Sequence, residues 1–402
     1  MAEDSLICRR NVIALRILVG LALGPLPLSA WTIELLYGKD EIFPSALASL
    51  TDRAPFPPAD IVPFQLGDPK GLVAIRLVAP HDNCRVRVEL SKTRLFHTSS
   101  IELELPQGGK TYRVAPYLRL DHDSLLDIRH PIAGEQLTAS VTIDGRTETQ
   151  ERTVRVHAIN DCLTSIEVDG HIHEVAYLAA AYANEFNPEI MARITQHALK
   201  NHYATAFDGY EAGSVEQVRT QVAAIYQSLH DMGLKYSTIY QASMTSGKAG
   251  TQWIRLPGET IRADQANCAD GAVLFASALT QIHLRAVLFF LPYEHVFIGV
   301  YLTAHGDESA GFEVIETTEV GYANYAKACQ EGAKKLAQLR ARKNMKEFRL
   351  TDSHNGGSFV WKYDKKHPLP DVFFNADINT ARRMGILPLS ELALLPIASD
   401  AQ

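Results

Sequence analysis

Three residues that together could form a nucleophilic site occur in order along the second half of the chain: Cys268, His295 and Glu316. Apolar residues follow Cys268 at helical spacing, which places this cysteine at the N-terminus of a predicted helix. That end of a helix carries a partial positive charge and free N–H groups, which favour a thiolate and can bind an oxyanion. His295 begins one predicted strand and Glu316 ends the next, so neighbouring antiparallel strands can present the two side chains together. The set is typical of thiol catalysis, in which a histidine is the base and an acid orients it.

The residues around this set also have structural interpretations. Taken alone, Cys268 would be interpreted as an inert buried cysteine, which is the common state of a free thiol, but His295 and Glu316 in the right order favour a nucleophile. Asp270 satisfies the preference for acids in the first helical turn. For Arg255 we expect an ion pair with Glu259, the alternative being a contact with a substrate carboxylate.

Three short motifs in this segment resemble a known family. They are Asn267–Gly271 (N-C-A-D-G), His295–Gly299 (H-V-F-I-G) and Glu316–Thr318 (E-T-T), with Gln252, Arg255 and Pro257 as a lead-in. Together and in this order they resemble the transglutaminase-like superfamily over about residues 175–320, and most closely an exported, uncharacterised bacterial branch. The acid differs, because most of the superfamily has Asp where this chain has Glu316.

The resemblance implies a papain-like α+β domain and thiol-dependent acyl transfer on amide or peptide bonds. It also suggests a second oxyanion donor, a role that Gln fills in papain-like sites and Trp in true transglutaminases. Gln252 and Trp253 are the two candidates, and we include Gln252 with the predicted catalytic residues Cys268, His295 and Glu316.

The first half of the chain is predicted to be a β-sandwich. Alternating segments separated by turn signals indicate an antiparallel β-sandwich domain over residues 66–162; the strands are expected at 71–78, 84–90, 101–105, 137–143 and 153–157. Proline-rich residues 31–65 are predicted to be an extended lead-in. A sandwich of this kind has no required catalytic role.

Near residue 162 the period changes to that of helices, which predicts an α+β transglutaminase-like domain over 165–320. The elements expected there are helices at 175–186, 188–202 and 214–231 and strands at 286–291, 296–302 and 312–315. Residues 321–402 are predicted to be a helical extension. Its basic helix, 322–346, is interpreted as a solvated surface.

Residues 1–30 are predicted to be a signal peptide, because a basic stretch precedes a short apolar run and small residues before Trp31. We therefore expect a periplasmic or secreted protein. No later stretch is apolar enough to span a membrane.

Composition excludes several classes of protein. The 402 residues are 46% hydrophobic with a net charge of −7, so we expect no nucleic-acid partner. Five cysteines are too few for a disulfide scaffold, although a Cys84–Cys162 bond stays open. Residues 171–174 and 246–248 lack the full zincin and P-loop patterns, so no metal and no cofactor is predicted.

The expected function is hydrolysis of an amide or peptide bond in the bacterial envelope, on a protein or peptide substrate. Two alternatives are protein crosslinking and a catalytically inactive binding protein on the same fold.

Overall fold

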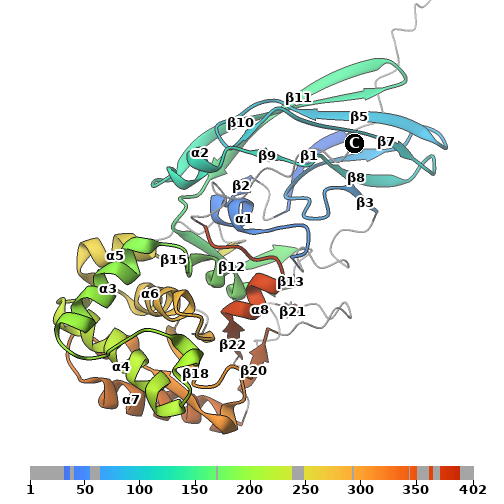
Figure 1. The fold of residues 1–402 in the computed structure, drawn as a ribbon. Helices are drawn as coiled ribbons and strands as arrows, with labels where there is room; N and C mark the ends of the chain where they lie inside the picture. Colours follow the sequence, from blue (N-terminus) through green and yellow to red (C-terminus); the bar gives the residue numbers. More distant parts are fainter. Residues whose placement is uncertain are drawn as a thin grey trace, which may run out of the picture.

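The computed structural model describes residues 31–36, 40–54, 64–168, 171–237, 249–291, 294–343, 345–350, 362–364 and 372–389. The protein has a mixed α and β architecture (Figure 1). The sheets of the first half of the chain lie at one end, and most helices lie at the other end together with a further sheet. Between them lie α1 (Pro44–Ser49), β12 (Asp161–Val168) and β13 (His171–Glu174). The predicted signal peptide lies outside the described residues. No helix in the described part of the chain is long and apolar enough to cross a membrane.

The first half of the chain forms two principal sheets. One has the order β1-β4-β8-β3 and the other β2-β11-β10-β5-β7. Their bounds are β1 (Trp31–Leu35), β2 (Glu41–Ile42), β3 (Gln65–Gly67), β4 (Val73–Val78), β5 (Cys84–Leu90), β7 (Ser99–Leu105), β8 (Thr111–Ala115), β10 (Ile132–Ile143) and β11 (Arg146–Val156). A small pair, β6 (Phe96–His97) with β9 (Arg119–Leu120), and helix α2 (His122–Leu126) complete this part.

The alternation of apolar and polar side chains explains why these segments form strands. Along β5, Val86, Val88 and Leu90 are buried, whereas Arg85 and Arg87 are exposed. The buried side chains of both sheets belong to one hydrophobic cluster. All five strands expected in this region are present, and most pairs are antiparallel, but β2 with β11 and β3 with β8 are parallel.

Residues 31–65 are not simply an extended lead-in. β1 pairs with β4 over its whole length, and α1 (Pro44–Ser49) is a helix whose six residues are all buried. Pro44 begins this helix instead of breaking it, since a proline lacks only an N–H that the first turn leaves unpaired anyway. The proline-rich stretch 55–63 lies outside the described residues.

A single strand crosses the predicted boundary between residues 162 and 165. β12 (Asp161–Val168) belongs to a sheet of order β15-β12-β13-β21, with β13 (His171–Glu174), β15 (Ala249–Trp253) and β21 (Lys362–Asp364). Residues 161–166 are all buried, so the segment shows no alternation that would reveal a strand in the sequence.

The longer helices of the described residues lie in the second half of the chain. They are α3 (Pro188–Lys200), α4 (Val215–Asp231), α5 (Pro257–Ala263) and α6 (Cys268–Gln281), followed later by α7 (Tyr325–Ala341) and α8 (Ile378–Arg383). Ser214 caps α4, its hydroxyl accepting from the N–H of Gln217 at 3.2 Å, and Gly233 follows the helix at φ +87°. The helix predicted at 175–186 is instead a buried 3-10 turn, η1 (Ala176–Tyr182). The remaining short elements are η2 (Gly209–Ala212), η3 (Glu308–Ala310), η4 (Thr317–Glu319), β14 (Lys235–Tyr236) and β16 (Gln265–Ala266).

Residues 321–402 are not only a helical extension, because they complete a sheet. Its order is β19-β18-β17-β22-β20, with β17 (Ala286–Leu291), β18 (His295–Tyr301), β19 (Phe312–Ile315), β20 (Lys346–Arg349) and β22 (Val372–Asp377). β22 pairs antiparallel with β17 and parallel with β20. The paired residues lie 84 to 90 positions apart between β17 and β22 and 26 positions apart between β20 and β22, so no local pattern predicts these pairings.

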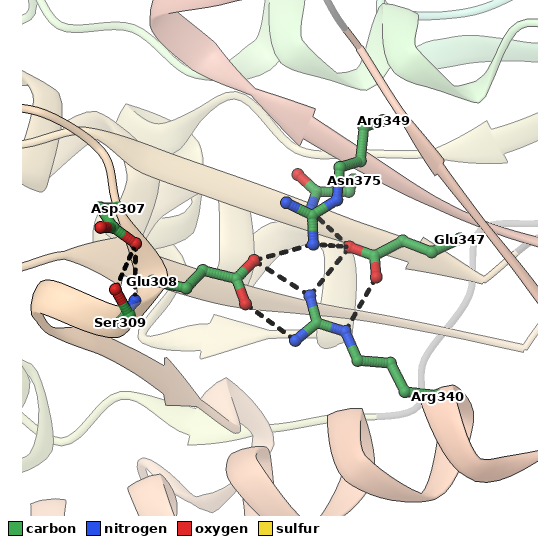
Figure 2. A network of polar contacts seen from close by, with 7 residues as sticks. All are labelled: Asp307, Glu308, Ser309, Arg340, Glu347, Arg349 and Asn375. Atoms are coloured by element: carbon green, nitrogen blue, oxygen red, sulfur yellow. Dashed lines mark hydrogen bonds and ion pairs between the residues drawn. The ribbon is translucent and has the colours of Figure 1, made fainter.

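An ion-pair network fastens α7 to the end of this sheet (Figure 2). The Arg340 guanidinium donates to Glu308 at 2.9 and 3.0 Å and to Glu347 at 2.8 and 3.0 Å. Arg349 donates to Glu308 at 2.9 Å, and the Asn375 amide donates to Glu347 at 2.7 Å. The network therefore connects η3, α7, β20 and β22.

Candidate active site

Cys268 is the first residue of α6, as its apolar spacing predicts, and it is buried. A reciprocal capping box fixes this end of the helix. The Asn267 side chain accepts from the N–H of Asp270 at 2.8 Å, and the Asp270 carboxylate accepts from the N–H of Asn267 at 3.1 Å. Every residue from Cys268 to Thr280 is buried, so the helix start is held rigidly in the core.

His295 and Glu316 meet across neighbouring strands. His295 begins β18, Glu316 directly follows β19, and the two strands pair antiparallel. The Nε2 atom of His295 lies 2.8 and 3.0 Å from the two carboxylate oxygens of Glu316. Glu316 also accepts from the N–H of Thr318 at 3.2 Å and from its hydroxyl at 2.7 Å. The E-T-T turn therefore orients the acid that in turn orients the histidine.

The side chain of Cys268 is near enough to the His295 ring to raise the pKa of His295 by hydrogen bonding. The structure thus brings together three of the four predicted catalytic residues in the order thiol, imidazole, carboxylate.

The electrostatics of this chain favour a charged histidine. Burial opposes the imidazolium, but the hydrogen bonds with Cys268 and Glu316 and the negative charge of Glu316 raise the pKa of His295 to about 9. Burial likewise opposes a charged Glu316, but His295 and Lys335 lower the pKa of this carboxyl to about 2. At neutral pH the pair is therefore an imidazolium beside a carboxylate.

Gln252, the fourth predicted residue, has no described contact with Cys268. It lies on β15 opposite Cys162, and its side-chain amide donates to the carbonyl of Trp253 at 3.0 Å. The segment nonetheless runs beside the start of α6, because the Arg255 backbone N–H donates to Asp270 at 2.7 Å.

The prediction of an ion pair between Arg255 and Glu259 is wrong. The Arg255 guanidinium contacts the buried Asp270 carboxylate at 3.0 Å. Glu259 instead pairs with Arg129 and accepts from the Asn160 amide at 3.0 Å. Asp270 therefore does more than satisfy the first turn: it ties the lead-in segment to the cysteine helix. The N-x-x-D spacing of a capping box was the available sequence signal.

Lys335 is a residue of the site that sequence reasoning missed. Its Nζ atom lies 2.5 Å from the Glu316 carboxylate, whereas the sequence predicts a solvated surface for this basic helix. No sequence signal marks it, because five other Lys and Arg residues between positions 327 and 343 have the same local context.

The other cysteines of the described residues take no part in this site. Cys84, Cys162 and Cys329 are free thiols, so the Cys84–Cys162 bond left open by the sequence is not formed. Burial raises the pKa of Cys84 and Cys162, and raises that of Cys329 to about 12. Among the described residues, no cluster of three or more His, Cys, Asp or Glu side chains could hold a metal ion.

Comparison with known proteins adds no assignment. No protein-family model matches the chain, and no curated protein matches it. The function must therefore be inferred from the site itself.

Proposed function

We propose that the protein is a thiol-dependent acyl-transfer enzyme that cleaves amide or peptide bonds, with Cys268 as nucleophile, His295 as acid and base, and Glu316 as orienter. The single observation that supports this most is the position of His295: its Nε2 atom lies 2.8 Å from the Glu316 carboxylate, and Cys268 and Glu316 both raise its pKa. A partly buried histidine between a thiol and a carboxylate is the arrangement that thiol catalysis requires.

In the proposed reaction the Cys268 thiolate attacks the amide carbon, forming a C–S bond and an oxyanion. The free N–H groups of the first turn of α6 stabilise that oxyanion. The intermediate then collapses, the C–N bond breaks, and the His295 imidazolium gives its proton to the leaving amine. Water attacks the thioester with neutral His295 as base, which releases a carboxylic acid and restores the thiolate–imidazolium pair.

Gln252 remains a candidate for the second oxyanion donor in this proposal. Its amide would have to release the Trp253 carbonyl and turn toward Cys268. Its segment is close to the start of α6 through Arg255 and Asp270, which supports the role.

The finer architecture belongs to the same proposal. We infer a β-sandwich domain in the first half of the chain and a transglutaminase-like domain in the second. Support comes from the two sheets with a common buried cluster and from the order of cysteine helix, histidine strand and acid. The predicted signal over residues 1–30 supports action outside the cytoplasm, on an envelope protein or a peptidoglycan peptide.

The test compares cells carrying the wild-type chain with cells carrying Cys268→Ala, by mass spectrometry of the envelope fraction. Cys329→Ala is the matched control, because it removes a partly buried thiol outside the site. Cleavage products that depend on Cys268 but not on Cys329 would support hydrolysis. Isopeptide links with the same dependence would redirect the proposal to crosslinking, and identical proteomes would favour the inactive binding protein.

A further inference from the structure

We propose that Lys335 is a positioning residue of this site: it holds the Glu316 carboxylate between two cations and so sets how readily His295 gives up its proton. This inference rests on the proposed function, and it assigns to α7 a part in a site otherwise built by α6, β18 and the turn after β19.

The Glu316 carboxylate contacts Lys335, His295 and Thr318 at the same time. Its Oε2 atom lies 2.5 Å from Nζ of Lys335 and 2.8 Å from Nε2 of His295, while Oε1 accepts from Thr318 at 2.7 Å. The side chain of Glu316 is only 3% exposed. A buried carboxylate with this many charged and polar donors is held in one orientation.

The backbone explains why Lys335 reaches this carboxylate. The N–H of Glu316 donates to the carbonyl of Ala328 on α7 at 3.1 Å. One turn later, a Cβ on Gly332 would lie 2.5 Å from the carbonyl oxygen of Val314, so only glycine allows α7 to approach β19 this closely. Lys335 follows Gly332 by three positions and therefore lies on the same face of the helix.

The far end of α7 is fixed as well. Arg340 joins the network with Glu308 and Glu347 (Figure 2), so the helix cannot easily rotate away from the sheet. Lys335 is thus positioned from both sides along the same helix.

The adjacent Lys334 shows the contrast with an ordinary surface lysine. It is 62% exposed, and within the described part of the chain its one ion pair is with Glu331 of its own helix, at 3.5 Å. Exposed ion pairs of that kind contribute little to the free energy of unfolding. Lys335 has the same chemistry one position away, but its partner is the buried acid of the site.

The charges around Glu316 determine how strongly His295 holds its proton. The groups that contact the Glu316 carboxylate among the described residues are His295 from β18, Thr318 from η4 and Lys335 from α7, and Cys268 acts on the other side of His295. Two cations that contact one carboxylate oxygen repel each other, so the charge of Lys335 makes the His295 imidazolium less stable. Removing the lysine should leave Glu316 to His295 alone, so that the imidazolium is held more strongly and donates its proton less readily.

The experiment uses the full chain and needs no substrate. The His295 ring is titrated by NMR in the wild type, in Lys335→Met and in the matched control Lys334→Met. We expect Lys335→Met to move the His295 titration to higher pH by about one unit, whereas Lys334→Met leaves it in place. Lys335→Arg, which keeps the positive charge, should keep the wild-type titration even if the methionine variant folds poorly.

Two outcomes would overturn the inference: an unchanged titration in Lys335→Met, or a shift in Lys335→Arg as large as in Lys335→Met. Neither bears on the proposed function, which is judged separately by iodoacetamide labelling of Cys268 in the wild type and in His295→Ala. Rapid, His295-dependent labelling together with an unmoved titration would therefore reject Lys335 alone.

Discussion

Gly271 lies against Thr317: a Cβ placed on this glycine would be 3.1 Å from Oγ1 of Thr317 and 3.2 Å from its Cβ. Gly271 comes one turn after Cys268 in α6, and Thr317 directly follows Glu316. The close approach of helix and turn therefore depends on the missing side chain. It sets the distance between the element that presents the thiol and the one that presents the acid.

Gly271→Ala should consequently weaken both the fold and the site. Inside a helix, alanine normally stabilises by roughly 0.5–1 kcal/mol relative to glycine. Here we expect a net loss of about 1–2 kcal/mol in the free energy of unfolding, because Thr317 has to move. Urea denaturation measures this loss, with Gly134→Ala as the control, since a Cβ there would meet only Thr153 at 3.9 Å. An alanine variant as stable as the wild type would show that the turn yields without cost.

Cys268 should be the most reactive of the described cysteines. Iodoacetamide at pH 6–7, followed by peptide mass analysis, should label it before Cys84, Cys162 and Cys329, whose thiols burial keeps protonated. His295→Ala should slow the labelling by about tenfold or more, because the cation that stabilises the thiolate is gone. Glu316→Gln should slow it less, since Glu316 acts only through His295. Equal labelling of all four thiols would identify Cys268 as an ordinary core residue.

The His295–Glu316 pair should stabilise the fold most between about pH 4.5 and 6.5. The pKa of His295 is raised from 6.5 to about 9, so its contribution is complete below 6.5 and is lost as the pH rises through 9. The pKa of Glu316 is lowered from 4.5 to about 2, so its contribution is complete above 4.5 and is lost as the pH falls through 2.

The measurement is the difference in unfolding free energy between the wild type and His295→Ala across this range. It should be largest near pH 5–6 and shrink toward pH 9 and above. His305→Ala, which changes an exposed histidine of the loop after β18, should show no such profile. A difference that grows with alkaline pH would contradict the charged pair.

A fully buried histidine, His157, should stabilise the junction between the two halves of the chain. His157 follows β11 and lies 3.2 Å from Asp161 of β12 and 3.5 Å from Glu41 of β2, with its ring stacked on Phe43 at 4.0 Å. His157→Ala would leave both buried carboxylates without this cation, and we expect a loss of about 3–5 kcal/mol in unfolding free energy.

The pH dependence of that loss has a definite sign. Burial opposes the charged ring, but Asp161 and Glu41 raise the pKa of His157 above 6.5. The contribution is therefore complete below pH 6.5 and disappears as the pH rises through the folded-state value. Thermal unfolding of the wild type and of His157→Ala at pH 6 and pH 9 should show a smaller gap at pH 9, and an equal gap would mean that His157 is neutral in the fold.

The sequence alone was enough for the strands and residues that have local signals. Alternation predicted β5 at its observed bounds, a short apolar run did the same for β17, and the bounds predicted for β19 are also those observed. The spacing behind Cys268 predicted the start of α6, and the order of His295 and Glu316 on neighbouring strands predicted their contact. These features depend on residues a few positions apart or on adjacent strands, so the pattern in the chain contains them.

Tertiary structure decided what depends on partners far away in the sequence. Neither the pairing of β22 with β17 nor the path of β12 across the predicted boundary follows from a local period. The sequence offers Arg255 two acidic residues as ion-pair partners, Glu259 and Asp270. The packing of the Arg255 segment beside α6 determines that the partner is Asp270. Lys335 became part of the site, and Lys334 did not, because the docking of α7 on β19 fixes which lysine faces Glu316. Pattern determines the face of an element, but its partner is chosen by the packing of the whole chain.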